Sequence, residues 1–257
     1  VNGGTTRNRL AALDLTTGNT TPWNPNMNNT VSALTISGSN LYAGGDFTTV
    51  NGGTVRNRLA ALDLTTGTAT AWDPNVNSTV SALVVNGSNL YAGGYFTVVN
   101  GGTSRKYLAA LDLTTATATA WDPNVNNIVK TLAINGSNMY AGGFFTTVNG
   151  GTTRNRLAAL DLTTGTATAW NPNMSGWVGG LAISGSTLYA GGNFNTVNGG
   201  TSRNYLAALD LTTGTATAWN PNMNNSVFTL AISGSTLYAG GGFLNSSPPR
   251  NYLAPLN

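Results

Sequence analysis

The chain has 257 residues, of which only 7% are charged, against about 25% in an average soluble domain. It contains no Cys, His or Glu, which excludes disulfides, thiol or imidazole catalysis and the usual Cys/His zinc sites. The net charge of +3 is too dilute for a nucleic-acid groove, and no apolar run reaches the roughly 18 residues of a membrane span, so we expect no nucleic-acid partner and no membrane insertion.

The sequence repeats itself every 49 residues, and the motif Val-Asn-Gly-Gly marks the start of each copy at Val1, Val50, Val99, Val148 and Val197. A period of this size is typical of solenoids and propellers, in which each copy buries its apolar face against the next one. Near-identical copies favour several equivalent positions over one asymmetric catalytic site. We therefore expect a protein that is not an enzyme.

In chain order, one copy predicts four strands. An apolar, β-branched segment is followed by a tight turn at Gly87 and by a second short strand, which together form a hairpin. A polar connection then leads to a third strand and a fourth, and the loop Asp122-Pro-Asn closes the copy. The strands are expected at 80–86, 90–96, 108–113 and 117–121, with the connection at 99–105.

Strands that are apolar along most of their length are covered on both faces, which happens when four-stranded antiparallel units stack around an axis. The fold class is therefore predicted to be all-β, a β-propeller. The small residues of Tyr-Ala-Gly-Gly in the second strand suit a close approach between blades. A Trp that recurs once per copy supplies bulk between them, at positions 23, 72, 121, 170 and 219.

The string Leu-Tyr-Ala-Gly-Gly-x-Phe-Thr-Thr-Val-Asn-Gly-Gly-Thr-x-Arg-Asn, followed by Leu-Ala-Ala-Leu-Asp-Leu-Thr-Thr-Gly and Trp-Asp-Pro-Asn, resembles bacterial delta-60 repeat propellers. The segment Ala-Leu-Asp-Leu-Thr-Thr-Gly is also similar to the repeat of the quinoprotein-like and kelch-like propeller superfamily, where the Asp and the Gly shape a turn. This resemblance implies a propeller of extracellular type. The activity of quinoprotein dehydrogenases is not carried over, because Glu, Cys and His are missing, and we expect no cofactor and no metal site.

The first, second and fourth strands each occur five times, whereas the third occurs six times, the last as a degraded Leu253-Ala-Pro-Leu. This favours a single domain over 1–257 with five blades, in which N-terminal strands around Leu10 and Thr20 complete the last blade. A six-bladed ring, or a segment of a larger propeller, is the alternative. Since Pro255 cannot donate to a sheet ladder, the terminal copy is expected at a sheet edge or as a loosely attached tail.

Two repeated features have a structural interpretation and a functional alternative. The Arg and Asp of each copy are interpreted as a turn-capping Asp and an Arg that bonds it or loop carbonyls, with a ligand clamp as the alternative. The Trp-(Asn/Asp)-Pro-Asn loops and the Asn-Gly-Gly segments are interpreted as turns rather than as calcium or phosphate sites. The Arg/Asp pairs lie at 7/14, 56/63, 105/112, 154/161 and 203/210.

Three positions differ between copies: the residue after Tyr-Ala-Gly-Gly, the residue after the Val that opens the first strand, and the residue before that Val. Because the start of the first strand and the end of the second are neighbours in a hairpin, all three are expected at one end of the propeller, beside the long connections. Drift of unconstrained positions is the alternative. The candidate ligand-binding residues are Asp46, Tyr95, Phe144, Asn193, Lys130, Trp177 and Phe228.

The sequence therefore predicts a non-enzymatic binding or adhesion module, exported or at the bacterial cell surface, as either a monomeric domain or part of a larger assembly. Its Thr/Asn/Gly-rich, Lys-poor composition suggests that location. The expected partner is a glycan or a cell-surface protein, and Trp177, Tyr95 or Phe144 would stack on a sugar ring. A structural or engineered repeat scaffold without a ligand of its own is the alternative.

Overall fold

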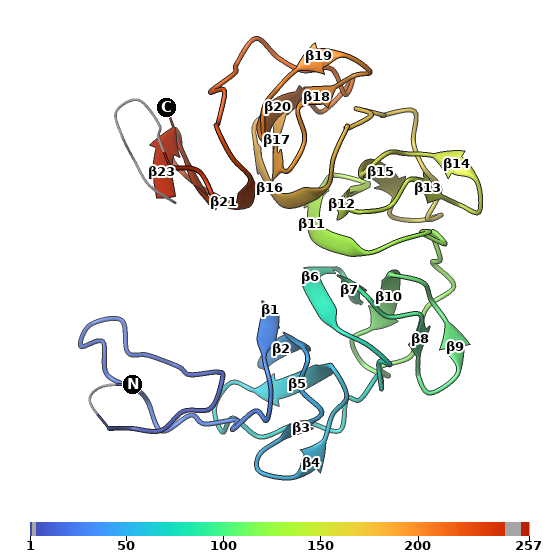
Figure 1. Cartoon of the computed structure of the whole chain (residues 1–257). Helices are drawn as coiled ribbons and strands as arrows, with labels where there is room; N and C mark the ends of the chain where they lie inside the picture. Colours follow the sequence, from blue (N-terminus) through green and yellow to red (C-terminus); the bar gives the residue numbers. More distant parts are fainter. Residues whose placement is uncertain (2–3, 245–252, 257) are drawn as a thin grey trace. The chain divides into compact units, whose positions relative to one another are not determined.

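The computed structural model describes residues 1, 4–244 and 253–256, and every regular element within these ranges is a β-strand (Figure 1). Two compact units divide the chain, Val1–Asp122 and Pro123–Asn257. Both are built from the same antiparallel motif, which confirms the all-β propeller class. Within the described ranges, no helix is long and apolar enough to cross a membrane.

Each copy forms one three-stranded antiparallel sheet with the second strand in the middle. The first two strands are joined by a two-residue turn, and the third returns after the long connection. The first strands are β1 (Val31–Ser37), β6 (Val80–Asn86), β11 (Val129–Asn135), β16 (Val178–Ser184) and β21 (Val227–Ser233). The second strands are β2 (Asn40–Gly45), β7 (Asn89–Gly94), β12 (Asn138–Gly143), β17 (Thr187–Gly192) and β22 (Thr236–Gly241). The third strands are β5 (Leu59–Asp63), β10 (Leu108–Asp112), β15 (Leu157–Asp161), β20 (Leu206–Asp210) and β23 (Leu253–Leu256).

The fourth strand is shorter than the sequence predicts, because each copy keeps only one isolated bridge, such as Leu62↔Ala69. The N–H of Thr70 still donates to the carbonyl of Ala61 at 2.9 Å. The carbonyl of Thr70, however, accepts a hydrogen bond from the guanidinium of Arg56, and its hydroxyl accepts one from the N–H of Trp72. Side chains thus satisfy groups that a longer strand would pair with a neighbour.

The polar connection between the second and third strands contains a small hairpin. In the first full copy, Asn51 takes a left-handed conformation with φ 49° at its tip and is followed by Gly52 at φ 75°. These values suit the Asn-Gly sequence, since both residues tolerate positive φ. The hairpins are β3 (Thr49–Val50) with β4 (Thr54–Val55), β8 (Val98–Val99) with β9 (Thr103–Ser104), β13 (Thr147–Val148) with β14 (Thr152–Thr153), and β18 (Thr196–Val197) with β19 (Thr201–Ser202).

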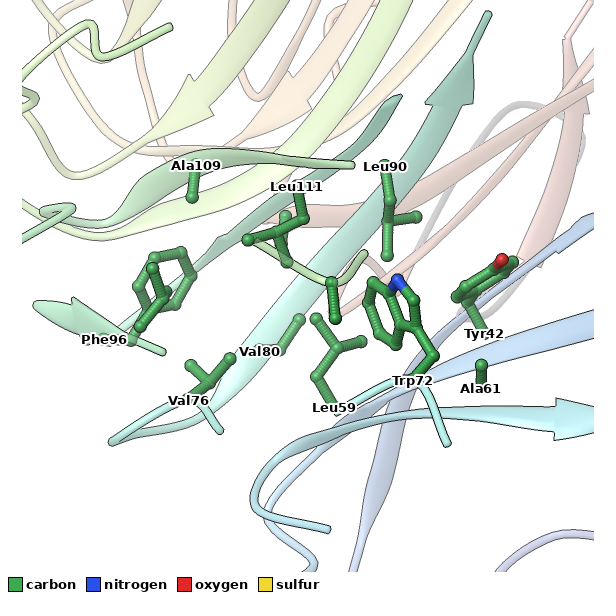
Figure 2. Packing of buried hydrophobic residues seen from close by; sticks show 13 residues of the cluster. Tyr42, Leu59, Ala61, Trp72, Val76, Val80, Leu90, Phe96, Ala109 and Leu111 are labelled. Atoms are coloured by element: carbon green, nitrogen blue, oxygen red, sulfur yellow. The ribbon is translucent and has the colours of Figure 1, made fainter. Parts of the chain in front are cut away.

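The repeated Trp joins one copy to the next. Trp72 lies edge-on against Tyr42, with ring centroids 5.1 Å apart and planes at 82° (Figure 2). Its indole N–H donates to the carbonyl of Asp112, one copy further along, at 3.0 Å. The close approach expected of the second strand is also present, because a Cβ on Gly44 would lie 2.5 Å from Cγ1 of Val80 in the next copy.

The last sheet corrects one expectation. Its order is β21-β22-β23, with Leu237 opposite Leu256 and Tyr238 opposite Pro255. The C-terminal segment therefore fills the third-strand position that was expected for residues around Leu10. β23 is an edge strand, where a residue without an N–H is tolerated. The number of blades and the single domain stay predictions.

Candidate functional site

A β-bulge lies at the start of every first strand. In β1 the register runs Val31↔Gly45 and then Ala33↔Gly44, so Ser32 is an extra residue with no partner. A bulge turns its extra residue out of the ladder, and bulges are frequent beside functional sites. The extra residue is the variable one in every copy: Ser32, Ser81, Lys130, Gly179 and Phe228.

A backbone hydrogen bond beside this bulge joins the other two variable positions, the residue after Tyr-Ala-Gly-Gly and the residue before the strand-opening Val. The N–H of Asp46 donates to the carbonyl of Thr30 at 2.8 Å, and the same bond links Tyr95 to Thr79 at 2.9 Å. A Cβ on Gly45 would lie only 2.1 Å from the carbonyl oxygen of Thr30, so this position requires Gly. The equivalent bonds run from Phe144 to Ile128, from Asn193 to Trp177 and from Gly242 to Ser226. The three variable positions of a copy are thus neighbours.

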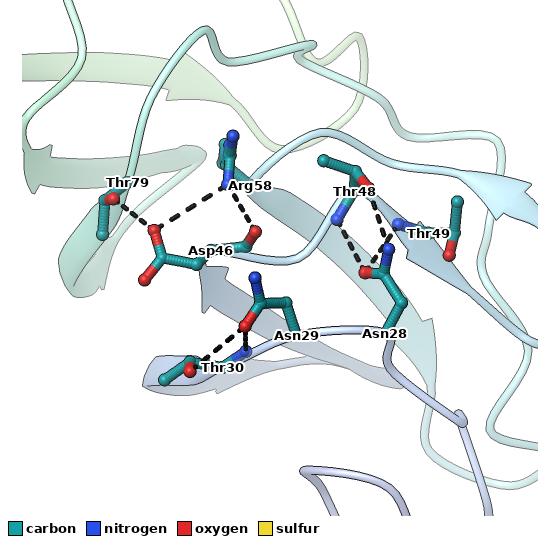
Figure 3. Close-up of polar contacts among 8 residues, drawn as sticks. All are labelled: Asn28, Asn29, Thr30, Asp46, Thr48, Thr49, Arg58 and Thr79. Atoms are coloured by element: carbon teal, nitrogen blue, oxygen red, sulfur yellow. Dashed lines mark hydrogen bonds and ion pairs between the residues drawn. The ribbon is translucent and has the colours of Figure 1, made fainter.

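Asp46 is held by polar contacts in the N-terminal unit (Figure 3). The hydroxyl of Thr79 donates to its carboxylate, and the guanidinium of Arg58 donates to its carbonyl oxygen and lies 3.8 Å from the carboxylate. The side chains of Arg58 and Asp46 are 29% and 41% exposed. An exposed pair of this kind contributes little stability and leaves both charges within reach of a partner.

The contact with Arg58 adds a site position to those predicted from the sequence. Arg58 has φ 66°, and Tyr107 and Arg156 have φ 63° and 65°. Left-handed backbone is costly for such side chains, and strain of this kind clusters at functional sites. The guanidinium of Arg156 donates to the carbonyl of Phe144, as Arg58 does to Asp46. In the sequence, this position differs from the rest of the repeat because some copies have Arg and others Tyr, which could have indicated a site position. The residues are Arg9, Arg58, Tyr107, Arg156 and Tyr205.

The C-terminal unit brings three candidate residues from three copies into one aromatic cluster. Trp177 stacks with Phe144 at 5.8 Å between ring centroids and 24° between planes. It also stacks with Phe228 at 5.9 Å and 14°. Phe228 remains 52% exposed, while Phe144 and Trp177 are half-buried. The variable positions therefore assemble an apolar surface at the bulged ends of the strands.

A glycine found only in this copy makes room for Trp177. A Cβ on Gly179 would lie 2.7 Å from Cζ3 of Trp177. Other copies carry Ser, Lys or Phe where this one has Gly179.

The remaining candidates, Tyr95, Asn193 and Lys130, lie at the same repeat positions. Tyr95 is 39% exposed in the N-terminal unit. Asn193 is exposed and touches Trp177 through its backbone, and Lys130 is a half-buried bulge residue. Their roles in ligand binding stay predictions.

The repeated Arg and Asp follow the structural interpretation. The carboxylate of Asp63 accepts hydrogen bonds from the N–H of Thr65 and from the N–H and hydroxyl of Thr66, which caps the turn. These bonds, led by that of the Thr66 N–H, hold the pKa of Asp63 below its ordinary value of 3.8. Arg56 donates to the carbonyls of Val55 and Thr70 instead of pairing with Asp63.

The Trp-Asp-Pro-Asn loop follows its structural interpretation as a turn, and one cavity of the C-terminal unit is small. Asn75 takes φ 43° and accepts a hydrogen bond from the amide of Asn57, which is a turn function. No three acidic, His or Cys side chains lie together within these ranges. A cavity of about 60 Å³ beside Tyr189 and Trp219 is far smaller than the roughly 300–1,000 Å³ of a ligand pocket.

Among solved structures, the extracellular domain of a hybrid two-component system from B. thetaiotaomicron is similar to this chain, with a TM-score of 0.59 and 18% identity. The alignment covers 92% of this chain and 27% of that one, and at this identity it shows the fold alone. The computationally designed Ika4 and Ika8 proteins align with TM-scores of 0.45 and 0.46, at 14% and 16% identity; they cover 70% and 82% of this chain, and 91% and 68% of their own.

No curated protein matches the chain. A family model does: residues 1–221 match the model described as outer membrane protein assembly factor BamB. This confirms the quinoprotein-like part of the expected resemblance, while the delta-60 assignment stays a prediction. Since the match spans most of the sequence, the chain belongs to the family described as outer membrane protein assembly factor BamB, a family of quinoprotein-like β-propellers.

Proposed function

We propose that this protein is a non-enzymatic binding module that holds a protein partner on its variable face. We define the variable face by positions of the C-terminal unit alone: the bulge residues, the residue before each strand-opening Val, the residue after each Tyr-Ala-Gly-Gly, and the left-handed Arg/Tyr position. The observation that carries the proposal is the cluster of Phe144, Trp177 and Phe228, which combines three copies and is accommodated by Gly179.

The composition of this face supports a protein partner. In a chain with 7% charged residues, the C-terminal unit places Lys130 and Arg156 at these positions together with the rings of Phe144, Trp177 and Phe228. The N-terminal unit has Asp46 and Arg58 at equivalent positions. Aromatic residues and Arg are the residue types enriched at the energetic centres of protein interfaces. The family description names an assembly factor, which also favours a protein. A glycan is less favoured, because Trp177 already stacks on two phenyl rings.

The same comparisons support a proposal about location. The family description names an outer membrane factor, and the similar solved structure is an extracellular domain. We therefore propose that the module works in the cell envelope or outside the cell. Fractionation of cells that express the protein would test this, and recovery in the cytosolic fraction alone would refute it.

Site-specific photocrosslinking tests the binding face. A benzophenone side chain placed at Phe228 or Asn193 should crosslink to one envelope protein, whereas the same group at Thr66, in the capped turn, should not. With that protein purified, Trp177→Ala should weaken binding by at least about tenfold, as expected for an interface hot spot. Thr66→Ala serves as the matched control.

Equal crosslinking from Phe228 and Thr66, or unchanged affinity of Trp177→Ala, would contradict the proposal. A glycan array probed with the native chain and with Trp177→Ala separates the carbohydrate alternative. If neither assay shows binding, the near-identity of the copies would favour a structural repeat scaffold without a ligand.

A further inference from the structure

Six Asn-Gly pairs lie in the described residues, in two different settings. Asn-Gly is chemically labile, because Gly has no side chain to keep its backbone nitrogen away from the preceding carboxamide, and Asn is among the thermolabile residues of proteins. Four pairs lie at the tips of the small hairpins, and two lie in the turns that end first strands. The pairs begin at Asn51, Asn100, Asn149 and Asn198, and at Asn86 and Asn135.

In the hairpin-tip asparagines, both Nδ2 and Oδ1 of the carboxamide form hydrogen bonds with the backbone. In the first of them, Nδ2 of Asn51 donates to the carbonyl of Gly67 at 2.9 Å, and Oδ1 accepts from the N–H of Ala69 at 2.7 Å. The other three repeat both bonds, with distances of 2.8–2.9 Å to the carbonyl and 2.8 Å from the N–H, at Asn100, Asn149 and Asn198. Rotation of the carboxamide toward the next nitrogen would break both.

The strand-end asparagines differ from the hairpin-tip asparagines in the hydrogen bonding of their carboxamides. Asn86 and Asn135 are exposed, and among the described residues no hydrogen bond restrains either carboxamide. Each precedes a Gly at φ 57° or 56° in a two-residue turn closed by Asn89 or Asn138. The equivalent residue in the other copies is Ser37, Ser184 and Ser233, so these two side chains have no repeated structural role.

We propose that Asn86 and Asn135 are sites of spontaneous succinimide formation and that the hairpin-tip asparagines are protected. The backbone nitrogen of Gly87 loses its proton and attacks Cγ of Asn86. The new N–Cγ bond forms as the Cγ–Nδ2 bond breaks, and Nδ2 leaves as ammonia. Water then opens the ring at either carbonyl and gives aspartate or isoaspartate, with no oxidant or reductant required.

Exposure alone does not separate the two settings. Asn51 and Asn149 are exposed residues, as Asn86 and Asn135 are. The difference is the pair of hydrogen bonds, and two such bonds lower the population of a free carboxamide by roughly 30-fold. Each conversion also adds one negative charge to a chain whose net charge is +3.

The test incubates the folded chain in mildly alkaline buffer and follows each Asn-Gly peptide by mass spectrometry, with a parallel sample in urea. In the folded sample Asn86 and Asn135 should convert at least about tenfold faster than the other four, given the two hydrogen bonds that must open. In urea all six should convert at similar rates, because the hydrogen bonds are gone.

The double variant Asn86→Ser and Asn135→Ser restores the residue of the other copies. It should turn acidic more slowly than the native chain in isoelectric focusing, because only its other Asn-Gly pairs, Asn2-Gly3 among them, can still convert. Equal rates at all six sites in the folded chain would overturn the proposal. It would also be overturned if Asn86 and Asn135 stayed intact while their peptides converted in urea.

Discussion

The indole ring of Trp177 lies nearly parallel to the phenyl ring of Phe228, with centroids 5.9 Å apart and planes at 14°. The two residues hold different repeat positions: Trp177 precedes the strand-opening Val of its copy, and Phe228 is the bulge residue of the next. Their contact exists because Gly179, the bulge residue between them in sequence, has no side chain. The contact between Trp177 and Phe228 therefore depends on the glycine at position 179.

This coupling predicts the effect of Gly179→Ala. Its Cβ would lie 2.7 Å from Cζ3 of Trp177, so the ring must shift, at a cost of about 1–3 kcal/mol in the free energy of unfolding. Gly53→Ala, with nothing within 4 Å, should change it by less than about 0.5 kcal/mol. In a Trp177→Thr background the cost of Gly179→Ala should largely vanish, and a full cost there, measured by urea unfolding, would refute the coupling.

The repeated Trp offers a second test, since its hydrogen bond is present at Trp72 and no equivalent bond occurs at Trp219 in the described residues. Trp72→Phe loses the bond to the carbonyl of Asp112 and leaves a cavity, so we expect a loss of about 2–4 kcal/mol. Trp219→Phe keeps a similar edge-on contact, to Tyr189 at 5.3 Å, and should cost about 1 kcal/mol less. Equal losses in thermal unfolding would show that the indole N–H contributes nothing.

Sequence reasoning located the elements whose cause is local. The β-branched run at 80–86, the turn at Gly87 and the capping Asp63 each follow from residue types within a few positions. The fourth strand was overestimated because its residues favour extended backbone, yet Arg56, from the preceding connection, takes the carbonyl of Thr70. The residues of the fourth strand alone do not show that a side chain from another segment will bond its backbone carbonyl.

The candidate site was predicted in part for the same reason. Hairpin pairing alone placed Asp46 beside Thr30. The bulge at Ser32 and the left-handed backbone of Arg58 could not be predicted, because a one-residue register shift and a positive φ for Arg are imposed by packing rather than by residue preference. The stack at Trp177 needed contacts between copies, which a period alone does not give.

The capped turns predict a pH dependence. Hydrogen bonds from Thr66 lower the pKa of Asp63 below 3.8 in the folded chain, so the ionised carboxylate favours folding. This stabilisation is fully present above the unfolded pKa and is lost as the pH falls through the folded one. The gap in melting temperature between the native chain and Asp63→Ala should therefore be constant from pH 7 to about 5 and narrow below about 4. A gap that stayed constant down to pH 2 would contradict this.

The hairpin tips predict different costs for two substitutions of Asn149. This residue has φ 51°, and its carboxamide bonds Gly165 and Ala167 at 2.9 and 2.8 Å. Asn149→Gly keeps the left-handed backbone but loses both bonds, which should cost about 1–3 kcal/mol. Asn149→Ala should cost about 1 kcal/mol more, because a Cβ is unfavourable at this φ. Urea unfolding of both variants measures the difference, and an Ala variant as stable as the Gly variant would show that the backbone conformation has relaxed.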